Sequence, residues 1–281
     1  GKIRNRPELV NDPNNLNSGN MGNSFQYYSA ALKLQLTDRI SFGLLYDQPF
    51  GADITYPMQS NNTFSDNEFT QQGTSVNVDT ESISMILGVN PFSNFQVYGG
   101  AVYQSVKGDV ALRGNSYSVA FNGYDAEFKK NHAVGWLAGL SYQIPDIALK
   151  AALTYRSKID HDMQVTETQF GQPLEATTPS KTRISTPQSV NIDFQTGVYK
   201  DTLLYTNLRW VNWKDFHIRP TQFGAVTEYL TGVVSNGSYT GGFDLDSYQK
   251  DQWTVNIGIG HQFTEKWSAS TEVSWDSGTG D

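Results

Sequence analysis

The chain contains no cysteine, so a disulfide framework, a thiol nucleophile and a thiolate metal site are all excluded. Charge is scarce as well, at 17% of residues against roughly 25% in ordinary soluble domains. The net charge of −8, with no basic cluster, argues against a nucleic-acid partner. No apolar run approaches the about 18 residues of a transmembrane helix. These absences leave open a membrane β-barrel, whose alternating strands average out as polar.

Period-two alternation of apolar and polar residues is the dominant pattern in the chain. Ile83, Met85, Leu87 and Val89, for example, alternate with smaller or more polar residues. The alternation predicts ten strands, at about 25–36, 40–56, 79–90, 95–112, 132–143, 147–164, 183–198, 202–219, 250–263 and 267–276.

Short and long connections alternate strictly between these strands. The long connections are expected near 57–78, 113–131, 165–182 and 220–249. Tight turns at one end and long loops at the other are typical of an outer-membrane barrel. A soluble sandwich usually has short turns at both ends. The pattern predicts an all-β fold, an antiparallel transmembrane β-barrel, with residues 1–281 forming one barrel domain in the bacterial outer membrane.

The polar face of the strands predicts a water-containing lumen, because charges seldom line the core of a soluble protein. Asp47, Arg156, Lys158 and Arg209 are among the charged residues expected on this lumen face. Each cation has a second interpretation, in which it forms an ion pair with a lumen carboxylate.

Two of the expected loops are less polar than loops usually are. One carries Leu112, Tyr117, Val119 and Phe121, and another lies at about 223–234. Apolar loops at the mouth of a polar lumen suggest capture of an apolar ligand. They are equally compatible with a lid whose side chains pack on one another.

No catalytic or metal-binding constellation stands out. The four histidines are scattered without metal-ligand spacing, and no serine is marked as a nucleophile with an ordered base. The sequence therefore predicts no enzyme, no metal and no cofactor.

Several segments together resemble the FadL family of outer-membrane transporters for long-chain fatty acids and other hydrophobic compounds. They are "SFQYYSAALKLQLTDRISFGLLYDQPFGADITYP", "ESISMILGVNPFSNFQVYGGAVYQSVKGDVAL", "ALTYRSKIDHDM" and "TPQSVNIDFQTGVYKDTLLYTNLRWVNWKDF". The resemblance implies ligand capture between outer loops at about 108–131 and 160–184, followed by transfer into the lumen. The ligand-binding groups it implies there are Asp47, Arg156, Lys158 and Arg209. It also implies a monomer that contacts outer-membrane lipid and takes up fatty acids, hydrocarbons or detergent. Family members have an N-terminal hatch and fourteen strands, so we expect an internal fragment without the hatch, the first strand and the last three strands.

The stretch "YDQPFGAD" interrupts a strand at Gln48, Pro49, Phe50 and Gly51. Proline cannot donate to a β-ladder, and glycine permits a bulge. The resemblance places these residues at a kinked strand that leaves a lateral opening in the barrel wall, through which an apolar substrate reaches the membrane. A bulge with a purely structural role is the alternative.

Two further functions are compatible with a barrel. A general diffusion porin would conduct ions and show little preference for apolar solutes. A structural or adhesion barrel would not retain lipid or detergent in its lumen.

Overall fold

The computed structural model describes residues 20–24, 26–58, 63–174 and 180–279. Its elements are β1 (Ala30–Gln35), β2 (Ile40–Asp47), β3 (Gly51–Thr55), β4 (Ser65–Asp66), β5 (Gln72–Gly73), β6 (Ser75–Phe92), β7 (Phe95–Leu112), η1 (Asn115–Tyr117), α1 (Ser118–Phe121), β8 (Tyr124–Ile144), η2 (Pro145–Ile147), β9 (Leu149–Arg156), β10 (Ile159–Gln169), β11 (Gln172–Pro173), β12 (Ser180–Thr186), β13 (Ser189–Tyr199), β14 (Thr202–Val211), η3 (Trp213–Asp215), β15 (His217–Ile218), α2 (Thr221–Val234), β16 (Asp246–Ser247), β17 (Gln252–Thr264) and β18 (Trp267–Asp276). Among these residues no helix is long and apolar enough to cross a membrane.

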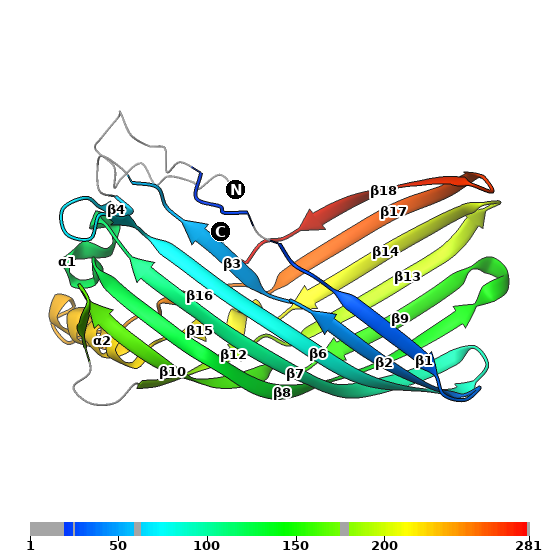
Figure 1. Cartoon of the computed structure of the whole chain (residues 1–281), viewed down its shortest axis with the longest axis horizontal. Helices are drawn as coiled ribbons and strands as arrows, with labels where there is room; N and C mark the ends of the chain where they lie inside the picture. Colours follow the sequence, from blue (N-terminus) through cyan, green and yellow to red (C-terminus); the bar gives the residue numbers. More distant parts are fainter. Residues whose placement is uncertain (1–19, 25, 59–62, 175–179, 280–281) are drawn as a thin grey trace.

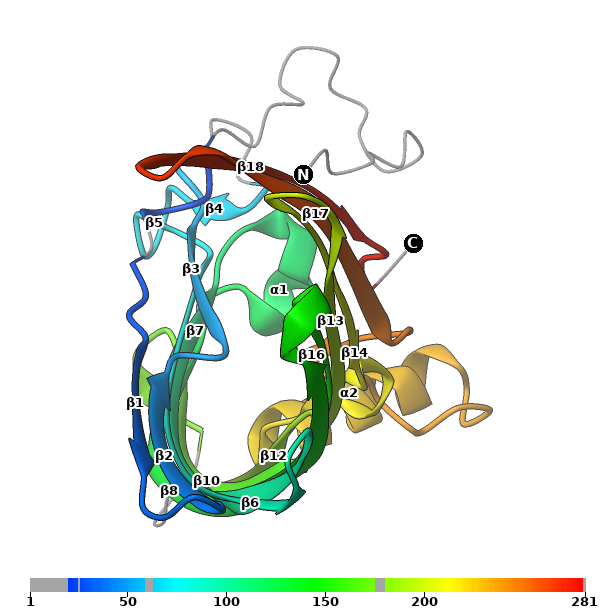
Figure 2. The ribbon, with the colours of Figure 1, turned by 90° about the vertical axis from the view of Figure 1, so that its right-hand side faces the viewer.

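Antiparallel pairing joins the long strands in the order β1-β2-β6-β7-β8-β9-β13-β14-β17-β18. The sheet curls around a lumen, with β1 and β18 at its two edges (Figure 2). Within the described residues β1 pairs only with β2, and β18 only with β17. Tight turns lie together at one end, and the long connections with α1 and α2 lie at the other (Figure 1). The predicted all-β antiparallel barrel, with ten strands along its path, is confirmed.

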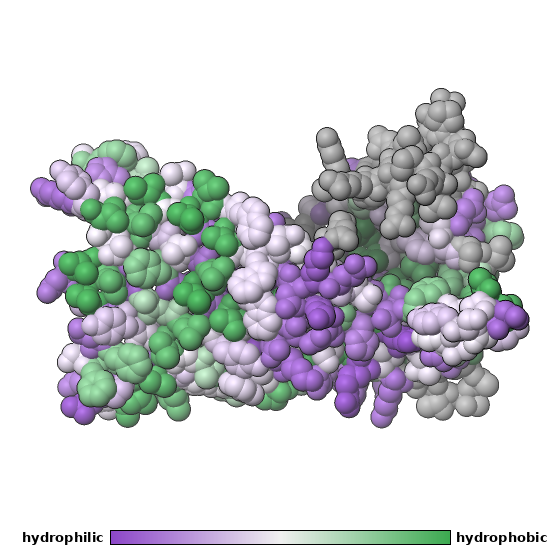
Figure 3. Space-filling model, turned by 180° about the vertical axis from the view of Figure 1, so that it is seen from behind, coloured by the Kyte–Doolittle hydropathy of each residue, from purple (hydrophilic) through white to green (hydrophobic). Residues whose placement is uncertain are grey.

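The outer surface near the tight turns is apolar. Ile83, Met85 and Leu87 on β6 are exposed, whereas Ser82 and Ser84, which alternate with Ile83 and Met85, are buried on the lumen side. Apolar side chains cover this half of the molecule, and a polar zone follows toward the long loops (Figure 3). This arrangement inverts the pattern of a soluble protein, as expected of a wall that faces lipid.

Toward the long loops, the inward side chains become apolar. Val106, Val110, Ala126, Phe128 and Val165 belong to one buried cluster there. Charged pairs instead lie on the outside, including Lys107 with Asp79 and Lys130 with Glu81. This end of the barrel therefore packs around its own hydrophobic core, as a soluble β-structure does.

The four expected loops contain more regular structure than the sequence indicated. β6 begins at Ser75, β8 at Tyr124 and β12 at Ser180, each inside an expected loop, and β10 continues to Gln169. The range 220–249 contains the helix α2. These segments become regular because they bury apolar side chains against one another at the outer end.

Candidate functional site: the kinked strand and the lumen cavity

The predicted strand interruption lies between β2 and β3. β2 pairs with β6 up to Asp47 opposite Ser82, and β3 resumes with Gly51 opposite Asp79. Three residues on the kinked strand therefore face two on β6, which is the geometry of a bulge. The strand break is confirmed, and its role as a lateral opening remains a prediction.

Thr80 closes the bulge on the β6 side. Its hydroxyl accepts a 2.9 Å hydrogen bond from the backbone N–H of Phe50 and donates to the carbonyl of the same residue. Thr80 is buried, so one side chain replaces the ladder bonds that the break removes. The kink is therefore tied to β6 on this side.

On the opposite side of the kink, toward the N-terminal segment, the described residues 20–24 and 26–30 form no continuous ladder with the kinked strand. Pairing between β1 and β2 ends at Ala30 opposite Tyr46, and the next bridge joins Gly22 to Ile54. Between them, the N–H of Tyr28 donates to Oε1 of Gln48 at 2.8 Å. We call this interrupted part of the wall the ladder gap.

A cavity of about 270 Å³ lies in the lumen directly behind the kink. Pro49 and Phe50 form part of its wall. Its other lining residues come from strands around the barrel and their junctions: Asp47, Ser82, Val102, Gln104, Trp136, Arg156, Ser157, Ile159, Thr186, Pro187, Ser189, Asn191 and Arg209. The cavity thus combines apolar walls with charged groups, which is what an amphipathic ligand needs.

Three of the four charged residues predicted for the lumen meet in this cavity. Nη2 of Arg156 lies 3.6 Å from Oδ2 of Asp47. Oδ1 of Asp47 and Nε of Arg209 are buried without a hydrogen-bond partner among the described residues. The ion pair that the sequence left as the second interpretation is present for Arg156, while Arg209 keeps an unsatisfied donor.

Lys158 does not join them. Its side chain is 64% exposed and lies 3.5 Å from Oδ1 of Asp160. The cause is the break between β9 and β10 at residues 157–158, after which the inward positions change from even to odd numbers. Ile159 and His161 are therefore buried, whereas the strict alternation assumed from the sequence placed Lys158 inward.

The apolar loop residues pack on one another at the outer end. Leu112 and Phe121 are buried in one cluster with Phe223 of α2, and Tyr117 packs against that cluster. The side chain of Val119 lies outside the described residues. The lid interpretation therefore holds for Leu112 and Phe121, and capture of a ligand by these residues remains a prediction.

A smaller cavity of about 200 Å³ lies beside this lid. Its lining is almost entirely apolar: Ala120, Phe121, Tyr124, Gln169, Phe170, Leu174, Phe223 and Val226. These residues come from the segments around α1, the end of β10 and α2, so both outer regions that the resemblance indicated contribute to the cavity wall together with α2.

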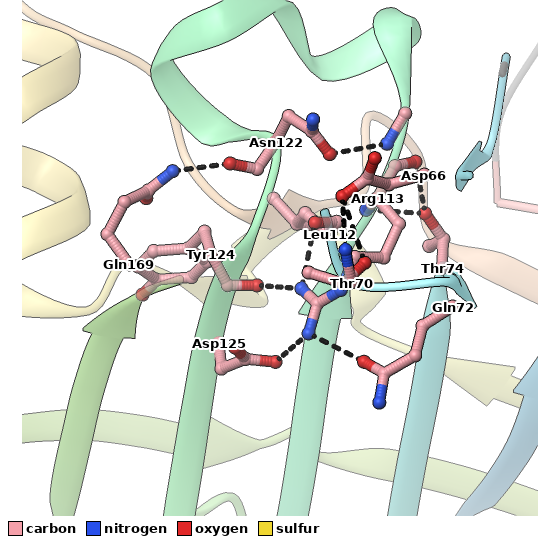
Figure 4. A network of polar contacts seen from close by, with 11 residues as sticks. Asp66, Thr70, Gln72, Thr74, Leu112, Arg113, Asn122, Tyr124, Asp125 and Gln169 are labelled. Carbon is pink, nitrogen blue, oxygen red and sulfur yellow. Dashed lines mark hydrogen bonds and ion pairs between the residues drawn. The ribbon is translucent and has the colours of Figure 1, made fainter. Parts of the chain in front are cut away.

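Arg113 holds the lid segments together. Its Nη1 donates to the carbonyls of Leu112 and Tyr124, and its Nη2 donates to Oε1 of Gln72 and to Oδ1 of Asp125 at 2.6 Å (Figure 4). Arg113 is only 4% exposed. One buried guanidinium therefore ties together β5, β7 and β8 beneath α1.

Sequence reasoning missed Thr80 and His161 as lumen residues, whereas the alternation did place Gln104 on the lumen side. Gln104 is 3% exposed, and its Oε1 accepts from Thr186 and contacts the buried ring of His161. Period-two alternation places Gln104 inward, but only the bend at 157–158 brings His161 to it.

Comparison with solved structures bears on the arrangement of the strands. A FadL homologue from Pseudomonas aeruginosa superimposes with a TM-score of 0.61 at 16% identity over 90% of this chain and 60% of that one. The toluene transporter TbuX of Ralstonia pickettii gives 0.60 at 13% identity, over 92% of this chain and 72% of that one. The chain has a FadL-like fold.

A third FadL-like structure, the toluene transporter TodX of Pseudomonas putida, matches with a TM-score of 0.55 at 12% identity, over 89% of this chain and 68% of that one. No family model and no curated protein matches the sequence. The chain thus spans about 60% of the Pseudomonas aeruginosa homologue and shares its FadL-like fold at low identity.

Proposed function

We propose that this protein transports hydrophobic compounds across the bacterial outer membrane. The observation that carries the proposal is the position of the lumen cavity: its wall includes Pro49 and Phe50, and the ladder gap lies beside them. A ligand in the cavity would therefore lie against the kink, next to the interrupted part of the wall. The FadL-like fold supports this proposal, since solved structures with that fold include toluene transporters.

The route has three stages. The apolar cavity beside the lid receives the ligand, and Phe121 and Phe223 offer it aromatic walls. The ligand then moves into the lumen cavity behind the kink. Exit follows through the ladder gap into the lipid, so that the apolar molecule avoids crossing water.

The charges of the lumen cavity suit an amphipathic ligand with an acidic head. The unpartnered Nε of Arg209 is available for a carboxylate, and Arg156 lies near enough to share the charge. Val102 and Ile159 provide apolar wall for the rest of the molecule. Fatty acids fit this chemistry, and small hydrocarbons would use the apolar wall alone.

The test is uptake by cells that express the full-length protein in a strain without other transporters of this kind. The probes are fluorescently labelled dodecanoic acid and radiolabelled toluene, and cells without the gene are the control. We expect at least one probe to accumulate faster with the protein than without it. Equal accumulation of both probes in the two strains would overturn the proposal.

A further inference from the structure

The ring of Phe50 does not lie along the barrel wall. It packs edge-on against Trp213, with the ring centroids 5.4 Å apart and the planes at 76°. Trp213 follows β14, and five strands separate β14 from β2 in the order of the sheet. The contact therefore crosses the interior of the barrel and does not join neighbouring strands.

Trp213 is firmly held on its own side. Its indole N–H donates a 2.8 Å hydrogen bond to Oε1 of Gln252, and its ring packs against Phe216 and Tyr248 at centroid distances of 5.3 and 5.0 Å. Phe50 is the one ring in this group of four that comes from the kinked strand. The other three rings form a fixed aromatic surface on which Phe50 rests.

Phe50 is held differently. Thr80 bonds its backbone N–H and carbonyl, so the main chain is fixed on the β6 side. On the other side lies the ladder gap, where strand pairing among the described residues is interrupted between the Ala30–Tyr46 pair and the Gly22–Ile54 bridge. The side chain also lines the lumen cavity. Rotation of one aromatic ring about its staggered side-chain angles therefore changes both the cavity wall and the contact with Trp213.

We propose that Phe50 and Trp213 form an aromatic gate, whose separation lets a ligand pass from the lumen cavity to the ladder gap. The proposal rests on the proposed transport function and adds the contact that controls it. In the closed state the ring of Phe50 packs edge-on against Trp213. An apolar ligand replaces the edge-to-face contact with contacts of its own and so moves the Phe50 ring aside.

Locking the gate is the sharpest test. The chain has no cysteine, so the double variant Phe50→Cys with Trp213→Cys contains a single pair of thiols. A short cross-linker reactive toward thiols and removable by a reducing agent then joins the two positions. The matched control is Trp210→Cys with Trp253→Cys, a pair on the neighbouring strands β14 and β17 whose rings are 6.5 Å apart.

We expect cross-linking of the Phe50–Trp213 pair to abolish uptake of labelled dodecanoic acid and toluene, and reduction to restore it. Cross-linking the control pair should leave uptake unchanged. Undiminished uptake in the cross-linked gate variant would overturn the gate and leave the transport function standing. If neither probe enters even through the unmodified protein, the proposed function itself fails, and the two failures are thereby distinguished.

Substitutions give a second test that needs no cross-linker. Phe50→Ala and Trp213→Ala should each raise the initial rate of toluene uptake by about threefold to tenfold. This factor corresponds to the interaction free energy that is lost when one aromatic pair is removed. The double variant should be no faster than the better single variant, because each change removes the same contact. Strictly multiplicative rates would show that the two rings act separately and would overturn the gate.

Discussion

The hydroxyl of Tyr124 donates a 2.7 Å hydrogen bond to Oε1 of Glu167, and each residue is only 1% exposed. The same carboxylate accepts from the backbone N–H groups of Gln222 and Phe223, in the first turn of α2. Burial, together with the negative charge of Glu167, raises the pKa of the Tyr124 hydroxyl. α2 begins after Pro220, which offers no side-chain cap, so Glu167 of β10 performs this role from another element.

Replacing Glu167 should therefore release α2 from the barrel. We expect Glu167→Ala to destabilise the docked helix by about 1–3 kcal/mol, because it leaves two helix N–H groups and a buried hydroxyl without their acceptor. Tyr124→Phe removes one of the three bonds and should cost less. Hydrogen exchange of the α2 amides measures both effects. Equal protection of α2 in wild type and Glu167→Ala would contradict this role.

The charge of Arg209 should matter for acidic ligands only. We expect Arg209→Met to reduce uptake of dodecanoic acid by about tenfold to a hundredfold while toluene uptake is unchanged, since a charge-assisted hydrogen bond to a carboxylate is worth about 1.5–3 kcal/mol. Lys158→Met is the matched control, because it removes a cation that the structure places outside the cavity. A loss of toluene uptake in Arg209→Met would instead indicate a structural defect.

Restoring the strand should close the lateral route. Pro49→Val returns a backbone donor, and Gly51→Val adds a residue that favours strands, so the double variant is expected to block uptake of both probes. Removing residue 49 altogether also takes away the one extra residue of the bulge and should block uptake more completely.

The result is informative only if the barrel of the double variant is folded. A difference in gel mobility between unheated and heated protein tests this. Pro91→Val, at the tight-turn end of β6, is the control and should transport normally. Normal uptake in the folded double variant would remove the lateral opening from the mechanism.

The turn after Asp66 should be sensitive to acid. Burial acts to raise the pKa of Asp66, but the N–H groups of Thr70, Phe69 and Glu68 and the Thr70 hydroxyl outweigh it, so the pKa lies below its ordinary value of 3.8. The stabilisation is therefore present above about pH 3.8 and is lost as the pH falls through the lower folded pKa.

Hydrogen exchange of the Glu68, Phe69 and Thr70 amides, followed from pH 6 to about pH 2, measures this loss after correction for the intrinsic rate. Asp66→Asn should show weaker protection at neutral pH and no acid transition. A transition that persists in Asp66→Asn would assign it to another group.

The helix α2 shows why part of the secondary structure at the outer end was not predicted from the sequence. Its sequence, TQFGAVTEYLTGVV, contains two glycines, three threonines and three valines, all weak helix formers. It is helical because Phe223, Gly224 and Thr227 are buried and because Glu167 caps its first turn. Burial and capping by Glu167 are both tertiary contacts, so the local sequence alone indicated a loop.

Lys158 shows the corresponding limit for the strands. Alternation assigned Arg156 to the lumen correctly, but the break at 157–158 reverses the parity of the residues that follow. A break of this kind depends on the neighbouring strand, where β12 and β13 separate at residues 187–188. The sequence of one strand alone therefore does not reveal where such a break lies.

By itself, the sequence determined the features that depend on near neighbours: the alternating faces of the long strands, the tight turns and the interruption at Pro49 and Gly51. These follow from a period of two residues and from a missing backbone donor, which are local properties. Only the tertiary structure decided which distant groups meet, such as Phe50 with Trp213 and Tyr124 with Glu167. Such contacts depend on how the sheet curls, and that curvature is set by all of its strands together.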